Sequence, residues 1–374
     1  MAKFLFCLPR YHTNAVPWTR ILLKAGHHIM IDVAGFGPTE NWDYVKPLRH
    51  EPGRLCRKLF RGKINGPDGM FYVFPDLKDY WIHLKHLNPD VVIVRGVTRW
   101  FPRIVAAFAL LQGRKLVIYD QEDVAPRRWS STWFRRAIFH LIGVPHMTPR
   151  LEKGNESGGC GEAIPLPFGC PFSSVFALTG KSEHNRWPPR ILMVGKYRER
   201  KGHVQLLKAL AMVAKHSKFT VTFCGEEVSE ADTSFCKMLR MQADKLGISN
   251  RVEFQNNVQH SQMLQLYQSH GLVVLPSWLE NGGISPVEGA WAGCAVLISQ
   301  DLGTRGYFPP GREYHFNPHD PSDIARALEG IFESPAKLAT SRSTCQSYIA
   351  RVASDDKIIA TFEAFIRYNR LISS

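Results

Sequence analysis

Short apolar strands alternate with helices twice along this chain, and a proline-rich stretch separates the two series. In the first series, the pattern predicts strands and helices over residues 3–8, 18–25, 29–34, 90–94, 104–111 and 116–119. Continuous apolar strands such as 90–94 are typical of parallel sheets that helices cover on both faces. The first series therefore predicts an α/β domain with a parallel, doubly wound sheet.

The second series begins at residue 190. It predicts strands over 190–194, 220–224, 251–254, 272–275 and 295–299, and helices over 203–216, 234–246, 261–269, from 286 onward, and over 323–332. The helix 203–216 carries Val204, Leu207 and Ala214 on one stripe, which is the helical period. We expect this series to form a second α/β domain.

Proline and glycine become frequent between residues 154 and 189, which is typical of a linker. At ~150 residues per domain, a chain of 374 residues accommodates two domains. We therefore predict a first domain over 1–172, a linker over 173–189, and a second domain over 190–354. A last helix, 355–368, is expected to pack back so that residues 355–374 complete the first domain.

Composition excludes several classes of protein. Hydrophobic residues make up 44% and charged residues 21%, which is ordinary for globular proteins and excludes a disordered or low-complexity chain. The longest apolar stretch, 104–111, is far shorter than the ~18 residues of a membrane-spanning helix. The N-terminal apolar run ends at Pro9-Arg10, too early for a signal peptide, and we expect a cytoplasmic protein.

The 8 cysteines form no C-x-x-C pair, so we expect reduced thiols and no structural metal.

Positive charge is concentrated in the first half of the chain. Residues 1–187 carry 26 Lys and Arg against 15 Asp and Glu, whereas the whole chain has a net charge of +14. One basic segment contains Arg49, Arg54, Arg57, Lys58, Arg61 and Lys63, with Leu55, Leu59 and Phe60 among them. A second segment contains Arg127, Arg128, Trp129, Trp133, Arg135 and Arg136. Cations with aromatic or apolar neighbours suit a nucleic acid, an anionic bilayer surface, or a solvated face without a partner. Charge alone leaves these three open.

The loop 195–202 follows a predicted strand and precedes a predicted helix. It places four cations, Lys196, Arg198, Arg200 and Lys201, within six positions. A helix N-terminus already carries partial positive charge and unpaired N–H groups. Because like charges this close repel one another, we expect a bound anion to neutralise them, and phosphate is the obvious candidate.

A second loop follows the strand 272–275 and contains Glu280, Asn281, Gly282, Gly283, Ile284 and Ser285. The two glycines let backbone N–H groups approach a ligand closely. Ser285 and Pro286 are predicted as the N-cap and the first helical residue. Glu288 then fits a capping box, so its role is open between closing its own helix and binding a ligand. Glu280 lies off the helix, at the strand end where open α/β sheets bind ligands.

Five short motifs occur in order within this second series. They are Gly195-Lys196 with Lys201-Gly202, Phe223-Cys224-Gly225, Arg251-Val252-x-Phe254, Leu275-Pro276-Ser277, and Glu280-x7-Glu288. Their order and spacing resemble the donor domain of the retaining GT-B glycosyltransferases of family GT4, the glycosyl transferases group 1. The resemblance covers about residues 190–332. It implies a GT-B fold, in which two Rossmann-like αβα domains face each other across a cleft.

The resemblance also implies roles for residues. Lys196, which is usually Arg in the family, and Lys201 would bind the donor pyrophosphate. Glu280 would hold hydroxyls of the transferred sugar and Glu288 the ribose, while the backbone of 282–285 would meet the β-phosphate or the sugar. The donor-binding set is then Gly195, Lys196, Lys201, Glu280, Asn281, Gly282, Gly283, Ile284, Ser285 and Glu288, and the catalytic set is Lys201, Glu280 and His12.

Front-face, retaining transfer from a nucleotide-diphosphate-sugar is the implied reaction. Cations and helix dipoles would stabilise the leaving diphosphate, so no metal or other cofactor is expected. The implied acceptor is a glycan, either lipid-linked or a polysaccharide, at the cytoplasmic face of the membrane. We expect the segment 127–136 to contact that anionic surface, and we expect no nucleic-acid partner.

The chain departs from the family at two places. After its first strand it has Pro9-Arg10-Tyr11-His12 where many members have two glycines, so His12 either faces donor or acceptor or caps its own loop. After the strand 116–119 it has Asp120-Gln121-Glu122-Asp123 where many members have a histidine. These acids contact the acceptor or sugar, or neutralise Arg127 and Arg128. Their spacing also suits a metal, although the family argues against one.

Three other functions stay open. A GT-B nucleotide-sugar epimerase would use a similar donor site, and product analysis without an acceptor separates it from a transferase. A catalytically silent glycosyltransferase-like subunit would tolerate loss of Glu280. A nucleic-acid-binding protein would bind DNA in a salt-dependent way without any effect of nucleotide-sugars.

Overall fold

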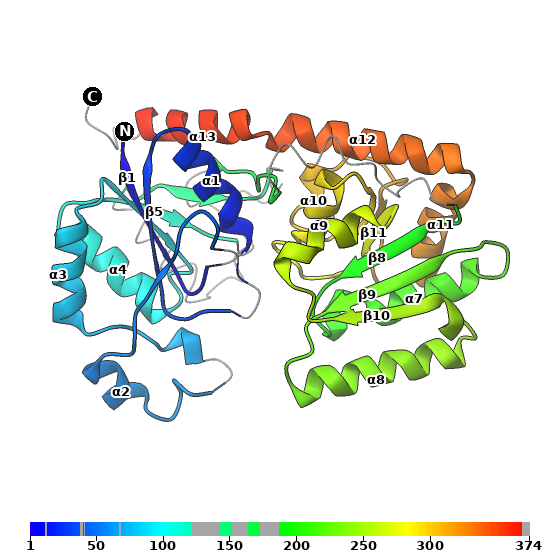
Figure 1. Ribbon diagram of the computed structural model, residues 1–374, viewed down its shortest axis with the longest axis horizontal. Coiled ribbons are helices and arrows are strands. Elements are labelled where there is room, and N and C mark those ends of the chain that lie inside the picture. Colours follow the sequence, from blue (N-terminus) through cyan, green and yellow to red (C-terminus); the bar gives the residue numbers. More distant parts are fainter. Residues whose placement is uncertain are drawn as a thin grey trace. The chain divides into compact units, whose positions relative to one another are not determined.

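The computed structural model describes residues 1–11, 13–37, 40, 42–66, 69–121, 143–151, 164–172 and 187–368. The chain divides into two compact units, which Figure 1 shows in colours that follow the sequence. The N-terminal unit contains Met1–Gly169 and Asp355–Ser374, and the C-terminal unit contains Cys170–Ser354. The ranges expected from the sequence were 1–172 with 355–374 for the first domain, and 190–354 for the second.

A parallel sheet forms the centre of the N-terminal unit. Its strand order is β3-β2-β1-β4-β5-β6-β7, and every pairing is parallel. The strands are β1 (Lys3–Leu8), β2 (His28–Val33), β3 (Leu48–Arg49), β4 (Val91–Arg95), β5 (Lys115–Tyr119), β6 (His146–Thr148) and β7 (Ile164–Pro165). The linker interpretation of residues 154–189 was wrong for part of this range, because β7 pairs with β6 and extends the sheet.

Helices cover this sheet, and the last one comes from the end of the chain. They are α1 (Val16–Lys24), α2 (Arg54–Phe60), α3 (Leu77–Leu87), α4 (Trp100–Leu111) and α13 (Asp355–Tyr368). The contacts of α13 include α1, where Arg20 donates to Asp355 Oδ1 at 2.8 Å. Ile358 and Phe362 are buried, and Phe362 packs edge-on against Phe4 of β1. The C-terminal helix therefore belongs to the N-terminal unit, although the residues just before it in sequence belong to the C-terminal unit.

The C-terminal unit repeats this architecture with a second parallel sheet. Its strand order is β10-β9-β8-β11-β12-β13. The strands are β8 (Arg190–Val194), β9 (Thr220–Gly225), β10 (Val252–Asn256), β11 (Leu272–Leu275), β12 (Ala295–Ser299) and β13 (His315–Phe316). The helices are α7 (His203–Val213), α8 (Glu230–Lys245), α9 (His260–Gln268), α10 (Ser285–Trp291), α11 (Pro321–Phe332) and α12 (Pro335–Ala353).

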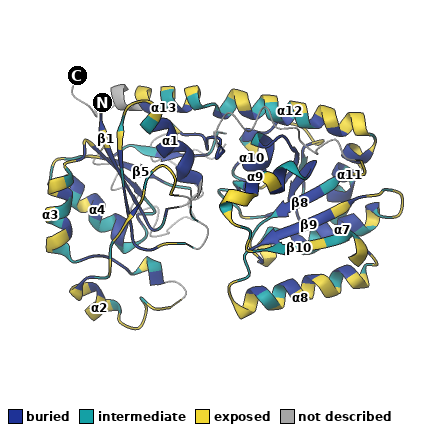
Figure 2. Cartoon of the chain, in the orientation of Figure 1, coloured by how far each residue is buried: buried dark blue, intermediate teal, exposed yellow. Residues whose placement is uncertain are grey.

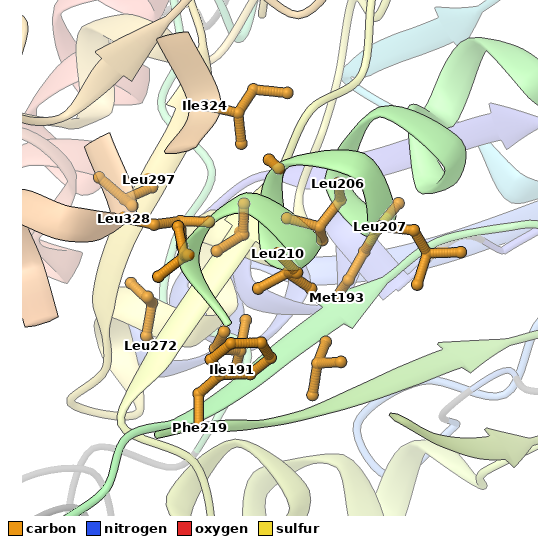
Figure 3. Packing of buried hydrophobic residues seen from close by; sticks show 14 of the residues in the cluster. Ile191, Met193, Leu206, Leu207, Leu210, Phe219, Leu272, Leu297, Ile324 and Leu328 are labelled. Carbon is orange, nitrogen blue, oxygen red and sulfur yellow. The ribbon is translucent and has the colours of Figure 1, made fainter. Parts of the chain in front are cut away.

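Aliphatic side chains from helices and strands interlock in the core of the C-terminal unit (Figure 3). Leu206, Leu207 and Leu210 of α7 are fully buried in one cluster with Met193 of β8 and Leu328 of α11. Burying a leucine side chain stabilises a fold by about 1.5–3 kcal/mol. This core holds the carboxyl ends of the strands in place, and it therefore fixes the points where the following loops begin.

The sequence did not predict the helices α2, α3 and α12, and it began α8 at the wrong residue. α8 begins at Glu230 rather than 234, because Ser229 and Asp232 form a capping box. α12 was missed altogether. Of its five buried residues, Leu338, Ser341, Cys345, Ile349 and Ala353, only Leu338 and Ile349 are large and apolar, so its apolar stripe is weak.

The seven cysteines in the described part of the chain are buried and form no disulfide. Within the same residues, no helix has both the length and the apolar character that crossing a bilayer requires.

Candidate functional site

The two loops that the sequence singled out lie side by side in the C-terminal unit. β8 pairs directly with β11, so the loops that follow these strands leave the same edge of the sheet from neighbouring positions. The backbone N–H of Trp278 donates to Arg200 O at 2.9 Å, which joins the loops. Gly202 has φ +78, and a Cβ there would lie 2.2 Å from the Pro276 carbonyl oxygen. Only glycine permits this approach.

Lys201 and Glu280 form a partly buried ion pair where the loops meet. Lys201 Nζ donates to Glu280 Oε2 at 2.6 Å, and each side chain is 13% exposed. Arg200 also donates to Oε2 at 2.6 Å, but its side chain is 47% exposed. The three residues were placed in their loops by sequence, and the structure brings their charged groups to one point.

The environment shifts the pKa of both partners. Burial lowers the pKa of Lys201 below its usual value, and the attraction of Glu280 opposes that shift without cancelling it. Burial raises the pKa of Glu280, but Lys201 and Arg200 outweigh it, so the net shift is downward. Glu280 is therefore ionised over a wide pH range, whereas the charge on Lys201 depends on Glu280.

One oxygen of Glu280 remains available to a ligand. Ser277, Arg200 and Lys201 all contact Oε2. Oε1 takes no hydrogen bond from any residue that the structure describes. A carboxylate oxygen held in this way accepts hydrogen bonds from hydroxyl groups, while the adjacent ammonium group attracts an anion.

The other cations of the 195–202 loop also have carboxylate partners. Lys196 Nζ lies 3.0 Å from Glu226 Oε2, and Arg198 pairs with Asp232 at the start of α8. In the structure these cations therefore pair with the protein's own acids, and the binding of an anion by this loop stays a prediction. Arg198 also donates to the Tyr197 carbonyl at 2.8 Å, so its guanidinium group has partners other than Glu280. Lys196 is exposed and keeps a flexible ammonium group near Lys201.

Ser285 and Glu288 behave differently from the predicted capping box. The N-cap of α10 is Ile284 and makes no side-chain hydrogen bond, so the prediction of Ser285 as N-cap was wrong. Ser285 Oγ instead donates to the Val194 carbonyl at 3.0 Å, where it ties α10 to β8. Glu288 is buried and accepts a hydrogen bond from the Tyr267 hydroxyl at 2.7 Å. Burial raises its pKa, and Tyr267 and His260 oppose that shift only in part.

The segment 281–284 is held by contacts with the turn 302–304. Gly303 N donates to the Glu280 carbonyl at 2.8 Å, and Thr304 Oγ1 donates to the Gly283 carbonyl at 2.9 Å. A Cβ on Gly283 would lie 2.6 Å from a methyl group of Leu302, so a larger residue there would force the Leu302 side chain to shift. Leu279, just ahead of Glu280, has φ 54 and is 80% exposed. Strain of this kind gathers at functional sites.

Sequence reasoning missed two residues of this site. Arg200 was counted among the loop cations without a role, and Tyr267 was only a position in a predicted helix. The other predicted donor residues, Gly195, Asn281, Gly282 and Ile284, lie in these two loops. Gly195 packs beside the Lys201 side chain, and its N–H donates to Cys224 O at 2.9 Å.

Several predicted residues lie outside the described part of the chain. These are His12, Arg127, Arg128, Trp129, Trp133, Arg135 and Arg136, together with Glu122 and Asp123. Asp120 and Gln121 are described, directly after β5.

Residues 177–349 match the family model described as glycosyl transferases group 1. The chain is 26% identical over 183 residues to D-inositol 3-phosphate glycosyltransferase 2 of Catenulispora acidiphila. That alignment covers 47% of this chain and 43% of the relative. It is 27% identical over 124 residues to a GDP-Man:Man(3)GlcNAc(2)-PP-Dol alpha-1,2-mannosyltransferase of Candida albicans, over 30% of this chain and 20% of the relative. The chain thus matches less than half the length of these relatives.

Solved structures resemble the whole chain. HepE of Anabaena, in complex with UDP and glucose, superposes with a TM-score of 0.74 at 16% identity, over 98% of this chain and 100% of that one. A glycosyltransferase of Rickettsia africae superposes with a TM-score of 0.73 at 14% identity, over 99% and 98% of the two chains. At these identities the likeness shows the fold alone, and that fold is GT-B.

Proposed function

Because residues 177–349 match the family model of the glycosyl transferases group 1, we propose that this chain transfers a sugar from a nucleotide-diphosphate-sugar to a glycan. The observation that carries this proposal is the Lys201–Glu280 pair at the junction of the loops after β8 and β11. It offers a cation for the leaving diphosphate and a carboxylate oxygen for sugar hydroxyls within one small site.

In this proposal the donor diphosphate lies against the 195–202 loop. Lys201 and Lys196 balance the charge that builds on the leaving phosphate as the glycosidic bond breaks, and the N-terminus of α7 adds its dipole. Glu280 Oε1 accepts from hydroxyls of the transferred sugar, and the backbone of 282–285 meets the β-phosphate or the sugar. Cations and dipoles serve in place of a metal ion, so the transfer needs no cofactor.

Glu288 is the proposed ligand of the ribose. Tyr267 holds Oε2 of this buried carboxylate, which orients it before a nucleotide binds. A neutral or ionised Glu288 can accept from a ribose hydroxyl, and its raised pKa makes the ionised form dependent on pH.

The stereochemical course and the acceptor belong to the same proposal. Transfer would retain the anomeric configuration by a front-face reaction, with His12 as a further catalytic residue facing donor or acceptor. The acceptor would be a lipid-linked glycan or a polysaccharide. The solved relative HepE holds UDP and glucose, and the Candida relative's name specifies GDP-mannose and a dolichol-linked glycan, which makes both uridine and guanosine donors worth testing.

A thermal-shift titration with UDP, GDP, ADP and their sugar conjugates tests the donor site. We expect one nucleotide series to raise the melting temperature, because a ligand at 100 times its Kd stabilises by about 2.7 kcal/mol. Product analysis with and without a glycan acceptor then separates transfer from epimerisation. Absence of a shift with every nucleotide would contradict the donor site and favour a silent glycosyltransferase-like subunit.

A surface of the N-terminal unit supports the proposed position at the inner face of the cell membrane. Figure 2 shows that α2 is largely exposed. Cys56 is fully buried and Phe60 packs against Trp100, but Leu55 and Leu59 are 44% and 59% exposed, one helical turn apart. These leucines lie among five exposed basic residues, Arg54, Arg57, Lys58, Arg61 and Lys63. Residues 52–66 contain no Asp or Glu.

This α2 surface, residues 54–63, suits an anionic lipid bilayer. Each basic residue near such a membrane contributes about 1 kcal/mol, and apolar side chains between the cations enter the interface. The second basic segment, 127–136, remains a proposed membrane contact of the same kind and lies outside the described residues.

Replacing both Leu55 and Leu59 by serine is expected to weaken binding to vesicles containing anionic lipid by at least about tenfold, because two leucines no longer leave water. Cosedimentation over a range of lipid concentrations measures the change. Leu111→Ser on α4 is the control, since that leucine is 74% exposed but lies outside the α2 surface. Equal binding by the double variant and the control would remove α2 from the membrane contact.

A charge reversal at Arg127, Arg128, Arg135 and Arg136 tests the second segment in the same assay. We expect vesicle binding to be lost and nucleotide binding to be kept. Sedimentation of this variant with anionic vesicles at the level of the unchanged protein would exclude the segment.

A further inference from the structure

Three side chains outside the donor site converge in the N-terminal unit. Asp32, near the carboxyl end of β2, is 2% exposed. His50 directly follows β3, and its backbone N–H donates to the Val33 carbonyl at 2.9 Å, which holds it beside Asp32. His83 comes from α3. Three separate elements of the fold therefore contribute one group each.

The geometry of this cluster suits a transition-metal ion. His50 Nε2 lies 3.3 Å from Asp32 Oδ1, and His83 Nε2 lies 3.1 Å from Asp32 Oδ2. The three ligand atoms all lie within 4.8 Å of one another. A tetrahedral ion with bonds of about 2.0–2.2 Å to nitrogen and oxygen needs ligand atoms about 3.3 Å apart. The two nitrogen–oxygen separations meet that requirement, while the full set, within 4.8 Å, would contract around an ion.

A second observation concerns the hydrogen bonds of the cluster. His50 Nε2 is buried and makes no regular hydrogen bond with the described residues, and its polar neighbour is Asp32 Oδ1 at 3.3 Å. A buried side-chain nitrogen in a folded protein normally has a hydrogen-bond partner. A metal ion beside Asp32 would bind to the lone pair of His50 Nε2.

Tyr80 prepares the carboxylate for the same role. Its hydroxyl donates to Asp32 Oδ2 at 2.8 Å, as partners behind metal-binding carboxylates do.

We propose that Asp32, His50 and His83 bind one divalent transition-metal ion, with Zn²⁺ the best match. Two imidazoles and a carboxylate are ligands that zinc prefers, whereas calcium and magnesium favour oxygen alone. The ion ties β2, the segment after β3 and α3 together, and so anchors the chain just ahead of the α2 surface. Its role is structural and separate from the proposed sugar transfer, which uses no metal.

Zinc titration of the chelator-treated full-length protein by calorimetry tests this proposal. We expect one high-affinity site, and Co²⁺ in its place should give the visible absorption of a tetrahedral nitrogen–oxygen site. His50→Ala and His83→Gln should each weaken binding at least tenfold, and Tyr80→Phe about tenfold. His86→Ala is the matched control, because His86 is exposed on the same helix and lies outside the cluster.

Circular dichroism of each variant checks its fold, and the partly exposed His83→Gln decides the matter if His50→Ala does not fold. Failure of the unchanged protein to bind Zn²⁺ stoichiometrically would overturn the proposal, as would equal affinity in His83→Gln and His86→Ala. The cluster would then be a carboxylate hydrogen-bonded to ordinary histidines.

Discussion

Replacing Lys201 by alanine is expected to lower kcat for sugar transfer by about a hundredfold to a thousandfold, the usual effect of removing one preorganised group that stabilises developing charge. The ammonium group is 13% exposed, so water screens it poorly and its effect on a leaving phosphate is large. The variant also leaves Glu280 without its buried partner, and donor affinity should fall too. Initial-rate kinetics with the donor found by thermal shift measures both effects.

Arg200→Ala is the matched control for this prediction. Arg200 donates to the same oxygen at the same 2.6 Å, but 47% of its side chain is exposed. Exposed ion pairs contribute about 0–1 kcal/mol, so we expect less than about a fivefold change. Similar losses in the two variants would mean that any positive charge near Glu280 suffices, and Lys201 would lose its specific role.

Replacing Glu280 by glutamine should change how donor binding depends on pH. Burial lowers the pKa of Lys201, and Glu280 is the main group that raises it again. Without the carboxylate, the Lys201 pKa falls further. Donor binding needs the protonated amine, so affinity is lost as pH rises through that pKa. The loss should therefore begin at lower pH in Glu280→Gln than in the unchanged protein.

Donor affinity measured from pH 6 to 10 in both proteins tests this shift. The same substitution also removes a charged acceptor for sugar hydroxyls, and kcat should fall by about a hundredfold or more. Glu329→Gln is the control, because Glu329 is an exposed partner of His216 far along the chain. An unchanged alkaline limit in Glu280→Gln would show that Lys201 does not carry the charge that the donor needs.

Local patterns predicted most of the long elements. The buried strands β4, β8 and β11 are continuous apolar runs, and α7 and α11 have strong helical periodicity, so their own sequences specify them. The short strands β3, β6 and β7 have two or three residues each and exist only because a neighbouring strand offers hydrogen bonds. No pattern of so few residues separates a strand from a loop.

The candidate site divides in the same way. Lys201 and Glu280 were recognised from residue type, glycine content and position after a strand. These two charges meet because β8 pairs with β11. Two other strands of the sheet, β9 and β10, lie between them in sequence. The wrong prediction of Ser285 as an N-cap has a similar cause, because its hydroxyl donates to the Val194 carbonyl on β8 and does not cap its own helix.

The sequence by itself determined two α/β units, the loops that carry the candidate site, and the match of residues 177–349 to the glycosyl transferases group 1 model, because apolar periodicity and motif spacing are local properties of a chain. Only the tertiary structure decided which acid neutralises which cation, which hydroxyl holds Glu288, and that Asp32, His50 and His83 share one point. Ion pairs and ligand clusters depend on distances between elements, and those distances are set by the order of the strands and the packing of helices on the sheet.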